Sequence, residues 1–201
     1  MMVLIIYSHP STNSYTNEIL RQVTSNLEKE EIDFEVSDLY AIDFKTDMSE
    51  EEYQREGFAN FDLPIPDDVK NEHQKIAKAD CIIFLYPVWW SDCPAKLKGW
   101  FDRVYSVGYA YGNDTLEDKN QLMKTIPLGI VICTAGHPNE FLDEIGIAKS
   151  MQNVMLDDRL GKRFSKKEMI ILGGTLNKDK VRTAHKEIID SLGKTIKNSI
   201  S

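Results

Sequence analysis

The stretch from Asp80 to Tyr111, DCIIFLYPVWWSDCPAKLKGWFDRVYSVGYAY, carries the most information about the fold. Its first part, Cys81–Tyr86, is a continuous apolar run, which is typical of a strand buried on both faces. A proline and two tryptophans follow, and Pro94 then stands where a new helix begins, a position that proline favours. Large aromatic residues at the end of a buried strand are what a flat, conjugated ligand would need.

Apolar runs and amphipathic segments alternate along the whole chain. The expected strands are Val3–Tyr7, Phe34–Leu39, Cys81–Tyr86, Leu128–Cys133 and Glu168–Leu172. The expected helices are Ser14–Leu27, Asp67–Ala79, Ala95–Val104, Glu140–Leu156 (with Ile145, Ala148, Met151 and Met155 facing inward) and Lys180–Lys197. This alternation predicts one doubly wound α/β domain over residues 1–201 with a parallel sheet. The polar segment Tyr40–Pro66 shows no clear strand or long helix, and loops of that length are usually lids or interface segments.

The composition argues against several classes of function. The chain has 201 residues and a net charge of −8, so it offers no basic field for nucleic acid or for an anionic membrane. Its acidic residues concentrate between Glu28 and Glu56, which we interpret as a solvated surface. Three cysteines without metal-binding spacing favour a reducing compartment. With no signal segment and no apolar run of membrane length, we expect a soluble cytoplasmic protein.

The first expected strand is followed by a loop rich in hydroxyl groups, SHPSTNSYTN over Ser8–Asn17. It contains neither GxGxxG nor GxxxxGK[ST], which excludes a Rossmann dinucleotide turn and a P-loop. Helix N-terminal amides together with Ser and Thr hydroxyls can hold a phosphate, and a protonated His9 could strengthen that site. Plain helix capping by Asn13 or Ser14 is the alternative.

Two further loops follow the third and fourth expected strands. Trp89 and Trp90 lie just beyond a strand end, where backbone N–H groups can bond a flat ring; a tryptophan pair buried in the core is the alternative. The fourth strand ends in CTAGHP, Cys133–Pro138, whose small residues would let the backbone approach a planar ring closely. His137 is either a plain loop residue or a group with a chemical role. Gly108–Tyr111 is either a hairpin-like surface loop or an aromatic lining for a substrate.

These motifs closely resemble those of the NAD(P)H:quinone oxidoreductase family, the DT-diaphorase relatives with a flavodoxin-like fold. The resemblance spans nearly the whole chain, and Asp80–Tyr111 is its most specific part. It implies a three-layer, doubly wound sheet of five parallel strands in the order 2-1-3-4-5. It also implies a flavin-dependent NAD(P)H oxidoreductase that reduces quinones or related electrophiles by two-electron, ping-pong hydride transfer. The flavin would carry this chemistry, and neither a nucleophilic side chain nor a metal is expected.

The resemblance assigns residues to each part of the site. The flavin phosphate and neighbouring atoms would lie against the first loop, at His9, Ser11, Ser14, Tyr15 and Thr16. The flavin ring would lie against the later loops, at Pro87, Val88, Trp89, Trp90, Ser91, Thr134, Ala135, Gly136 and Phe141. NAD(P)H and the acceptor would contact Tyr109, Tyr111 and His137, and a homodimer would bring the tyrosines from the other subunit.

The sequence departs from the family at positions that matter for the flavin. Phe141 stands where some well-studied relatives have a tyrosine, and Ile147 where they have a histidine, a pair that stabilises the reduced ring. Neither side chain carries a proton, so backbone N–H groups, water or His137 would have to compensate. Cys133 and Ala135 also depart from the usual Thr-Thr-Gly-Gly. FAD is the expected flavin, with FMN as the alternative, because the Trp–Trp segment looks closest to the FAD-binding branch.

Other functions are compatible with the same resemblance. Similar proteins serve as regulatory flavoprotein subunits of potassium-efflux systems at the membrane. A flavodoxin-type electron carrier would pass single electrons and lack a nicotinamide pocket, so the Tyr109 and Tyr111 segment argues against it. A flavodoxin-like domain that has lost its cofactor is the third alternative. No arginine is placed to separate NADPH from NADH, and the sequence does not name the acceptor.

Overall fold

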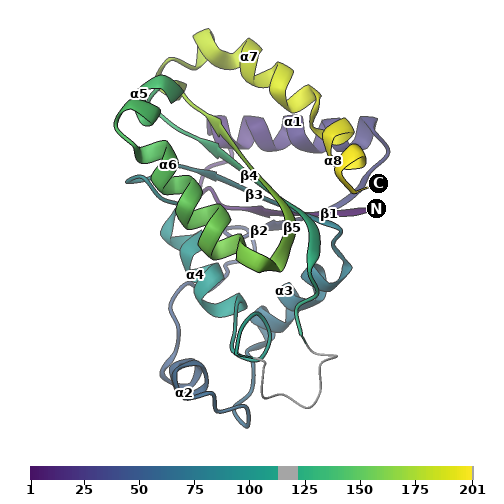
Figure 1. The fold of residues 1–201 in the computed structure, drawn as a ribbon, viewed down its shortest axis with the longest axis vertical. Helices are drawn as coiled ribbons and strands as arrows, with labels where there is room; N and C mark the ends of the chain where they lie inside the picture. Colours follow the sequence, from purple (N-terminus) through teal and green to yellow (C-terminus); the bar gives the residue numbers. More distant parts are fainter. Residues whose placement is uncertain (113–121, 201) are drawn as a thin grey trace.

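The computed structural model describes residues 1–112 and 122–200, and their centre is a five-stranded parallel sheet (Figure 1). The strand order is β2-β1-β3-β4-β5, and every neighbouring pair is parallel. The strands are β1 (Met2–Tyr7), β2 (Asp33–Asp38), β3 (Cys81–Pro87), β4 (Ile126–Thr134) and β5 (Phe164–Leu172). The predicted sheet and its order 2-1-3-4-5 are confirmed.

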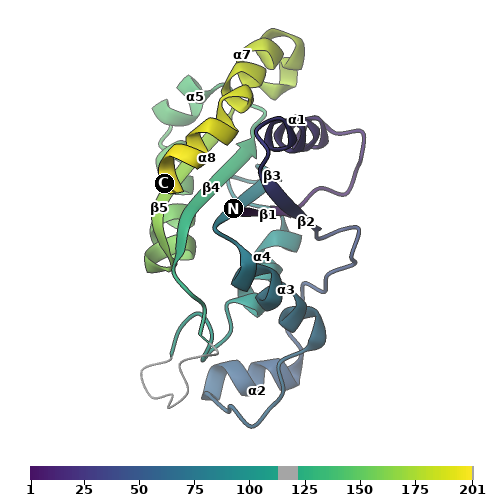
Figure 2. The ribbon, with the colours of Figure 1, turned by 90° about the vertical axis from the view of Figure 1, so that its right-hand side faces the viewer.

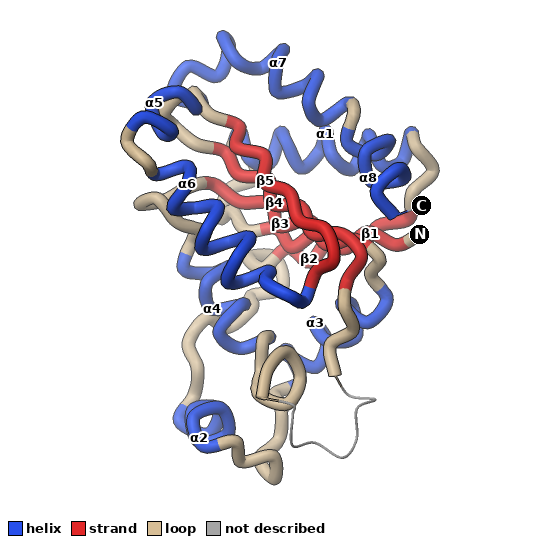
Figure 3. The backbone as a smooth tube through the Cα atoms, in the orientation of Figure 1, coloured by secondary structure: helices blue, strands red, loops and turns tan. Residues whose placement is uncertain are grey.

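Helices cover both faces of this sheet and complete three layers (Figures 2 and 3). One face carries α1 (Tyr15–Lys29), α7 (Lys178–Asp190) and α8 (Leu192–Ile200). The other face carries α3 (Asp67–Lys78), α4 (Ala95–Val104), α6 (Ile147–Gln152) and the π-helical segment Asn153–Leu160. Because strand side chains alternate between faces, each layer of helices buries its own hydrophobic core against the sheet.

The long helix expected over Glu140–Leu156 is wrong, because it is broken near its start. A short helix, α5 (Asn139–Glu144), ends before Gly146, whose φ of 75° lies in the left-handed region that glycine tolerates. Ile145 stands at this break and is 51% exposed rather than inward-facing. The other three residues of the expected inward face are buried as predicted: Ala148, Met151 and Met155.

The last expected helix, Lys180–Lys197, is likewise two helices, α7 and α8. They meet at Ser191, whose backbone N–H bonds the carbonyl of Ile188 within the preceding turn.

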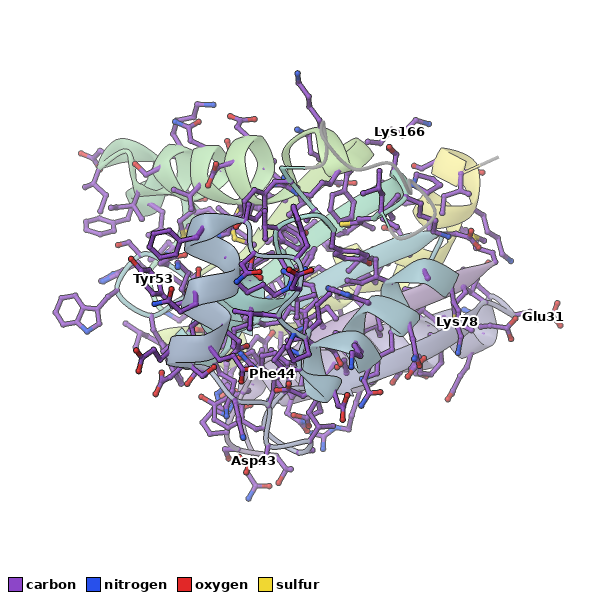
Figure 4. The ribbon with its side chains drawn as sticks, turned by 90° about the horizontal axis from the view of Figure 1, so that it is seen from below. Glu31, Asp43, Phe44, Tyr53, Lys78 and Lys166 are labelled. Atoms are coloured by element: carbon purple, nitrogen blue, oxygen red, sulfur yellow. The ribbon has the colours of Figure 1, made fainter. Side chains whose placement is uncertain are left out.

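The segment between β2 and α3 projects from the body of the molecule and contains the nine-residue helix α2 (Glu50–Phe58) (Figure 2). Arg103 of α4 anchors it, because its Nε donates to Glu52 at 2.6 Å and its Nη atoms donate to Asp68 at 2.6 and 3.0 Å. Glu52 is buried, so the interpretation of Glu28–Glu56 as solvated surface fails at this residue. Along the same segment Phe44 is buried whereas Asp43 is exposed (Figure 4).

Two general expectations from composition can be compared with the structure. All three cysteines are buried, and Cys81 and Cys133 lie in β3 and β4 as the small apolar side chains that were predicted there. Within the described ranges, no helix combines the length and the apolar character needed to cross a membrane.

Candidate functional site at the carboxyl edge of the sheet

The loops after β1, β3 and β4 leave the sheet at one edge, because parallel strands share the edge at which their carboxyl ends lie. Backbone hydrogen bonds join them there: Ser8 N donates to the Leu85 carbonyl at 3.0 Å, and Val88 N donates to the Thr134 carbonyl at 2.8 Å. The structure therefore brings together all three loops that the sequence assigned to the site.

In the first loop, Ser14 acts as the N-cap of α1. Its Oγ accepts a hydrogen bond from Asn17 N at 3.0 Å and donates one to the Ser11 carbonyl at 3.0 Å. The capping alternative is thus correct for Ser14. Capping takes one amide of the first turn, while the other N-terminal amides of a helix have no partner within the helix and can face an anion.

His9 connects the first loop to the second. Its Nδ1 accepts a hydrogen bond from Ser11 N at 2.9 Å, so the proton of the neutral ring is on Nε2. Burial lowers the pKa of His9 below its ordinary value, which favours the neutral ring. The imidazole also makes an edge contact with Trp89, with the ring centroids 6.1 Å apart. His9 can therefore offer a neutral Nε2–H donor at this edge, rather than the charged donor considered from the sequence.

Buried hydroxyl groups lie at the base of the same loop. The hydroxyl oxygens of Thr16 and Thr134 are 2.7 Å apart and tie the first loop to the end of β4. Ser8 is fully buried, and its hydroxyl has no hydrogen-bond partner in the part of the chain that the structure describes. A buried hydroxyl without a partner is costly, so it fits a site that a polar ligand completes. The Tyr15 hydroxyl bonds Nδ1 of His185 on α7 at 2.9 Å.

The second loop forms a tight hairpin. Trp89 N donates to the Asp92 carbonyl at 2.9 Å and Asp92 N donates to the Trp89 carbonyl at 3.2 Å. Trp90 and Ser91 occupy the turn with φ values of 50° and 63°, where Asn and Gly are usual. Trp89 is 43% exposed and Trp90 is fully exposed, so the alternative of a tryptophan pair buried in the core is wrong.

The second and third loops enclose a cavity of about 250 Å³. Its walls are formed by Val88, Trp90, Ser91, Ala135, Gly136, His137, Leu142 and Ile147. His137 is the single ionisable side chain among these lining residues, and its ring centroid lies 4.7 Å from that of Phe141. Phe141 is not part of the wall, whereas Ile147 contributes an apolar side chain to it. A flat ring would therefore meet an apolar wall with one imidazole at its rim.

Tyr109 and Tyr111 do not join this site within one chain. They follow the far end of α4, whose ten residues span about 15 Å from the Trp89 loop. Tyr109 is 8% exposed and its ring stacks on His73 at a centroid distance of 3.5 Å. Tyr111 is 47% exposed and donates to Glu56 Oε2 at 3.2 Å. A larger cavity of about 890 Å³ lies beside Tyr109, away from the strand ends.

Comparison with known proteins agrees with this geometry. A family model described as a flavodoxin-like fold matches residues 1–191. A solved NAD(P)H:quinone oxidoreductase from Methanothermobacter marburgensis has a TM-score of 0.88 and 41% sequence identity, covering 98% of this chain and 97% of that one. The chain belongs to the NAD(P)H:quinone oxidoreductase family of flavodoxin-like proteins. The resemblance seen in the sequence is confirmed.

Two other relatives of this quinone oxidoreductase family member are similar over most of the chain. An uncharacterized NAD(P)H oxidoreductase from Haemophilus influenzae is 33% identical over 159 residues, which are 77% of this chain and 74% of that protein. A ribosyldihydronicotinamide dehydrogenase-like protein, traD, from Penicillium crustosum is 32% identical over 178 residues. That match covers 77% of this chain and 65% of the fungal protein, so the chain spans just under two thirds of its length.

Sequence reasoning missed two residues that support the site in this family member. His185 of α7 holds the Tyr15 hydroxyl, and Arg159 holds Asp92 at the base of the hairpin. No local pattern marks either residue, because each acts across more than 60 positions of sequence. In the described ranges, no group of three His, Cys, Asp or Glu side chains is arranged to hold a metal ion.

Proposed function

We propose that this chain is a flavin-dependent NAD(P)H oxidoreductase that reduces quinones or related electrophiles by two-electron, ping-pong hydride transfer. One observation carries the proposal, in a chain of this family: the hydroxyl-rich first loop lies at the same sheet edge as the second and third loops, and those two loops line a cavity there. When bound, the flavin supplies the hydride chemistry, and the protein positions it and sets its electronics. FAD is the flavin we expect, with FMN as the alternative.

The first loop would hold the flavin phosphate. His9 offers its Nε2–H, Ser8 offers a buried hydroxyl that bonds no other group of the described residues, and α1 offers amides at its N-terminus. In the Thr16 and Thr134 pair one hydroxyl donates to the other, so the accepting group keeps its own proton for a ligand oxygen. All of these donors are neutral. They would bind the phosphate by hydrogen bonds alone, without a cationic side chain, in a protein whose net charge is −8.

The ring would occupy the cavity between the second and third loops. Ala135 is buried and Gly136 has no side chain, so the backbone of the third loop can approach a planar ligand. Trp90 would present a large aromatic surface to the ring, and Ile147 an apolar side chain. His137 is placed to contact NAD(P)H or the acceptor at the rim.

A second copy of the chain would complete the substrate site, as expected of a homodimer. Tyr111 is the residue that we assign to this contact, because it is exposed whereas Tyr109 is packed on His73. Tyr53 and Phe58 of α2 are also exposed, which gives the same side of the molecule an aromatic surface. We place the enzyme in the cytoplasm because its three cysteines are unpaired.

The visible spectrum of the purified protein tests this function. The protein is mixed with excess FAD or FMN and desalted, and the spectrum is then repeated anaerobically after NADPH or NADH is added. Retained absorbance near about 450 nm that bleaches with a reduced nicotinamide supports the enzyme and names its flavin. Flavin that is retained but not reduced would favour the electron carrier or the regulatory subunit. If neither flavin is retained, the assignments to the three loops are wrong.

A further inference from the structure

The hairpin that carries Trp90 meets His9 through Trp89 on one side, and an ion pair holds Asp92 at its other end. Arg159 Nη1 donates to Asp92 Oδ1 at 2.7 Å and Nη2 donates to Oδ2 at 2.9 Å, a bidentate arrangement. Asp92 is also the last residue of the hairpin, because its backbone pairs with that of Trp89. A movement of the hairpin base away from Arg159 would therefore break this pair.

Arg159 is itself held in place on its remaining sides. It is 8% exposed and lies in the π-helical segment Asn153–Leu160. Its Nη1 is 3.3 Å from Cys93 Sγ and 3.1 Å from Met155 Sδ, and its Cζ lies 5.4 Å from the centre of the Phe101 ring. Sulfur atoms and an aromatic face do not neutralise a guanidinium, so Asp92 supplies the charge that makes its burial tolerable.

The turn needs such support. Trp90 and Ser91 both have left-handed backbone conformations, which L-residues with large side chains adopt only where the surroundings hold them. The Trp90 side chain is fully exposed and thus gains nothing from burial in the protein. Ser91 has no left-handed preference either. The position of the turn therefore depends on its base, where Trp89 contacts His9 and Asp92 meets Arg159.

We propose that Arg159 is a positioning residue for the flavin site: through Asp92 it holds the hairpin so that Trp90 and Ser91 form a wall of the 250 Å³ cavity. This inference rests on the proposed function, because it takes the ligand of that cavity to be a flavin. Arg159 does not line the cavity itself. It acts through the loop and touches neither the ring nor the substrate.

Arg159 and Asp92 differ in solvent exposure, and this difference determines which of the two residues should be substituted. Asp92 is nearly half exposed, so water can solvate its carboxylate once Arg159 is removed. Arg159 is buried, so removing Asp92 leaves a charge without a partner and destabilises the fold. Arg159→Met removes the charge but keeps an apolar side chain of similar length among Cys93, Met155 and Phe101. It is the variant that frees the hairpin while retaining the core.

Arg163→Met is the matched control. Arg163 lies one turn further along, donates to the carbonyls of Asp158 and Arg159, and packs over Tyr105. It belongs to the adjoining 3₁₀ turn, Gly161–Arg163, and its hydrogen bonds to those carbonyls and its contact with that ring do not involve the hairpin. A general effect of losing an arginine here would appear in both variants.

Two measurements on the full chain test the proposal. Amide hydrogen exchange of the free protein reports the hairpin through Trp89 N and Asp92 N, and we expect both to exchange at least about tenfold faster in Arg159→Met. Flavin fluorescence titration with FAD and with FMN reports the site, and we expect the dissociation constant to rise about tenfold or more in the same variant. Arg163→Met should leave both quantities at the parental value.

Further variants keep the test decisive. If Arg159→Met does not fold, Arg159→Lys keeps the charge but loses the bidentate geometry, and it should show the same two effects more weakly. Asp92→Asn together with Arg159→Met should bind flavin no worse than Arg159→Met alone, because both changes remove one interaction. Unchanged exchange and unchanged flavin binding in Arg159→Met would overturn the proposal. A parental protein that binds neither flavin would instead overturn the proposed function, and the exchange measurement would still report whether Arg159 holds the hairpin.

Discussion

The hydroxyl groups of Thr16 and Thr134 lie 2.7 Å apart although 118 positions separate them in the sequence. Both are buried, and they join the first turn of α1 to the last residue of β4. This hydrogen bond therefore fixes the distance between the first and third loops where they leave the sheet. A ligand that bridges a phosphate site and a ring site needs these two loops to keep their spacing.

Thr16→Val should lower both stability and flavin affinity. The substitution keeps the shape of the side chain but leaves the buried Thr134 hydroxyl without a partner, which costs about 1–2 kcal/mol of unfolding free energy. Urea denaturation of the two single valine variants and of the double variant measures this. The double variant should be no less stable than the single ones, since it removes both polar groups; strictly additive losses would show that the pair does not act as a unit.

Trp90→Gly should separate stability from ligand binding. Glycine accepts the left-handed conformation of the turn, and the Trp90 side chain makes no buried contact that would be lost. The unfolding free energy of Trp90→Gly should exceed that of Trp90→Ala by about 1 kcal/mol, because alanine keeps the backbone strain. Both variants should bind flavin more weakly than the parent. If either retains parental affinity, Trp90 is not part of the ring site.

The comparison of sequence with structure shows which features local patterns can determine. The bounds of α4 were predicted to the residue, and those of β3 to within one residue, because a buried strand and an amphipathic helix leave strong periodic signals. The break at Gly146 was missed, since apolar residues on both sides continue the helical spacing. The exposure of Trp90 could not be predicted for a related reason. An aromatic residue at a strand end gives the same sequence pattern whether its side chain packs in the core or faces a ligand.

Contacts over long sequence separations account for the remainder of the site. The three loops could be assigned from the sequence because strand ends share one edge of a parallel sheet. The pairs Asp92 with Arg159 and Tyr15 with His185 could not, because their partners are 67 and 170 positions apart and one sequence carries no record of pairing. Tyr109 and Tyr111 were predicted to act together, yet the fold buries the Tyr109 ring and exposes that of Tyr111.

Acid should loosen the α2 segment before the sheet unfolds. Burial opposes ionisation of Asp68, but its hydrogen bonds with Arg103 outweigh this effect and hold its pKa below the ordinary value. A carboxyl group with a depressed folded pKa stabilises the protein above its unfolded pKa, near pH 4, and loses that contribution as the pH falls through the folded value. Amide exchange in Glu50–Phe58 should therefore accelerate below about pH 4 while that of β3 does not. Asp68→Asn should remove this pH dependence; a variant that keeps it would assign the effect to another carboxylate.

Exchange of subunits provides the strictest test of the assignment of Tyr111 to a second copy. Tyr111→Ala should retain flavin but lose most NAD(P)H-dependent turnover, because the side chain would complete the partner's site and not its own. Gly136→Val should lose the flavin, since Gly136 lines the ring cavity and a branched side chain there alters the wall that the ring would meet. The fold should tolerate the change, because the added Cβ would lie 3.3 Å from Cγ of Leu176, whose side chain is exposed. The two inactive variants are then mixed in equal amounts, so that subunits redistribute between dimers. Half of the dimers would contain one subunit of each variant, and each of these would have one intact site out of two. The mixture should therefore recover about a quarter of the parental activity. A mixture that stays inactive, from variants shown by sedimentation to be dimeric, would place Tyr111 in the site of its own chain or outside any site.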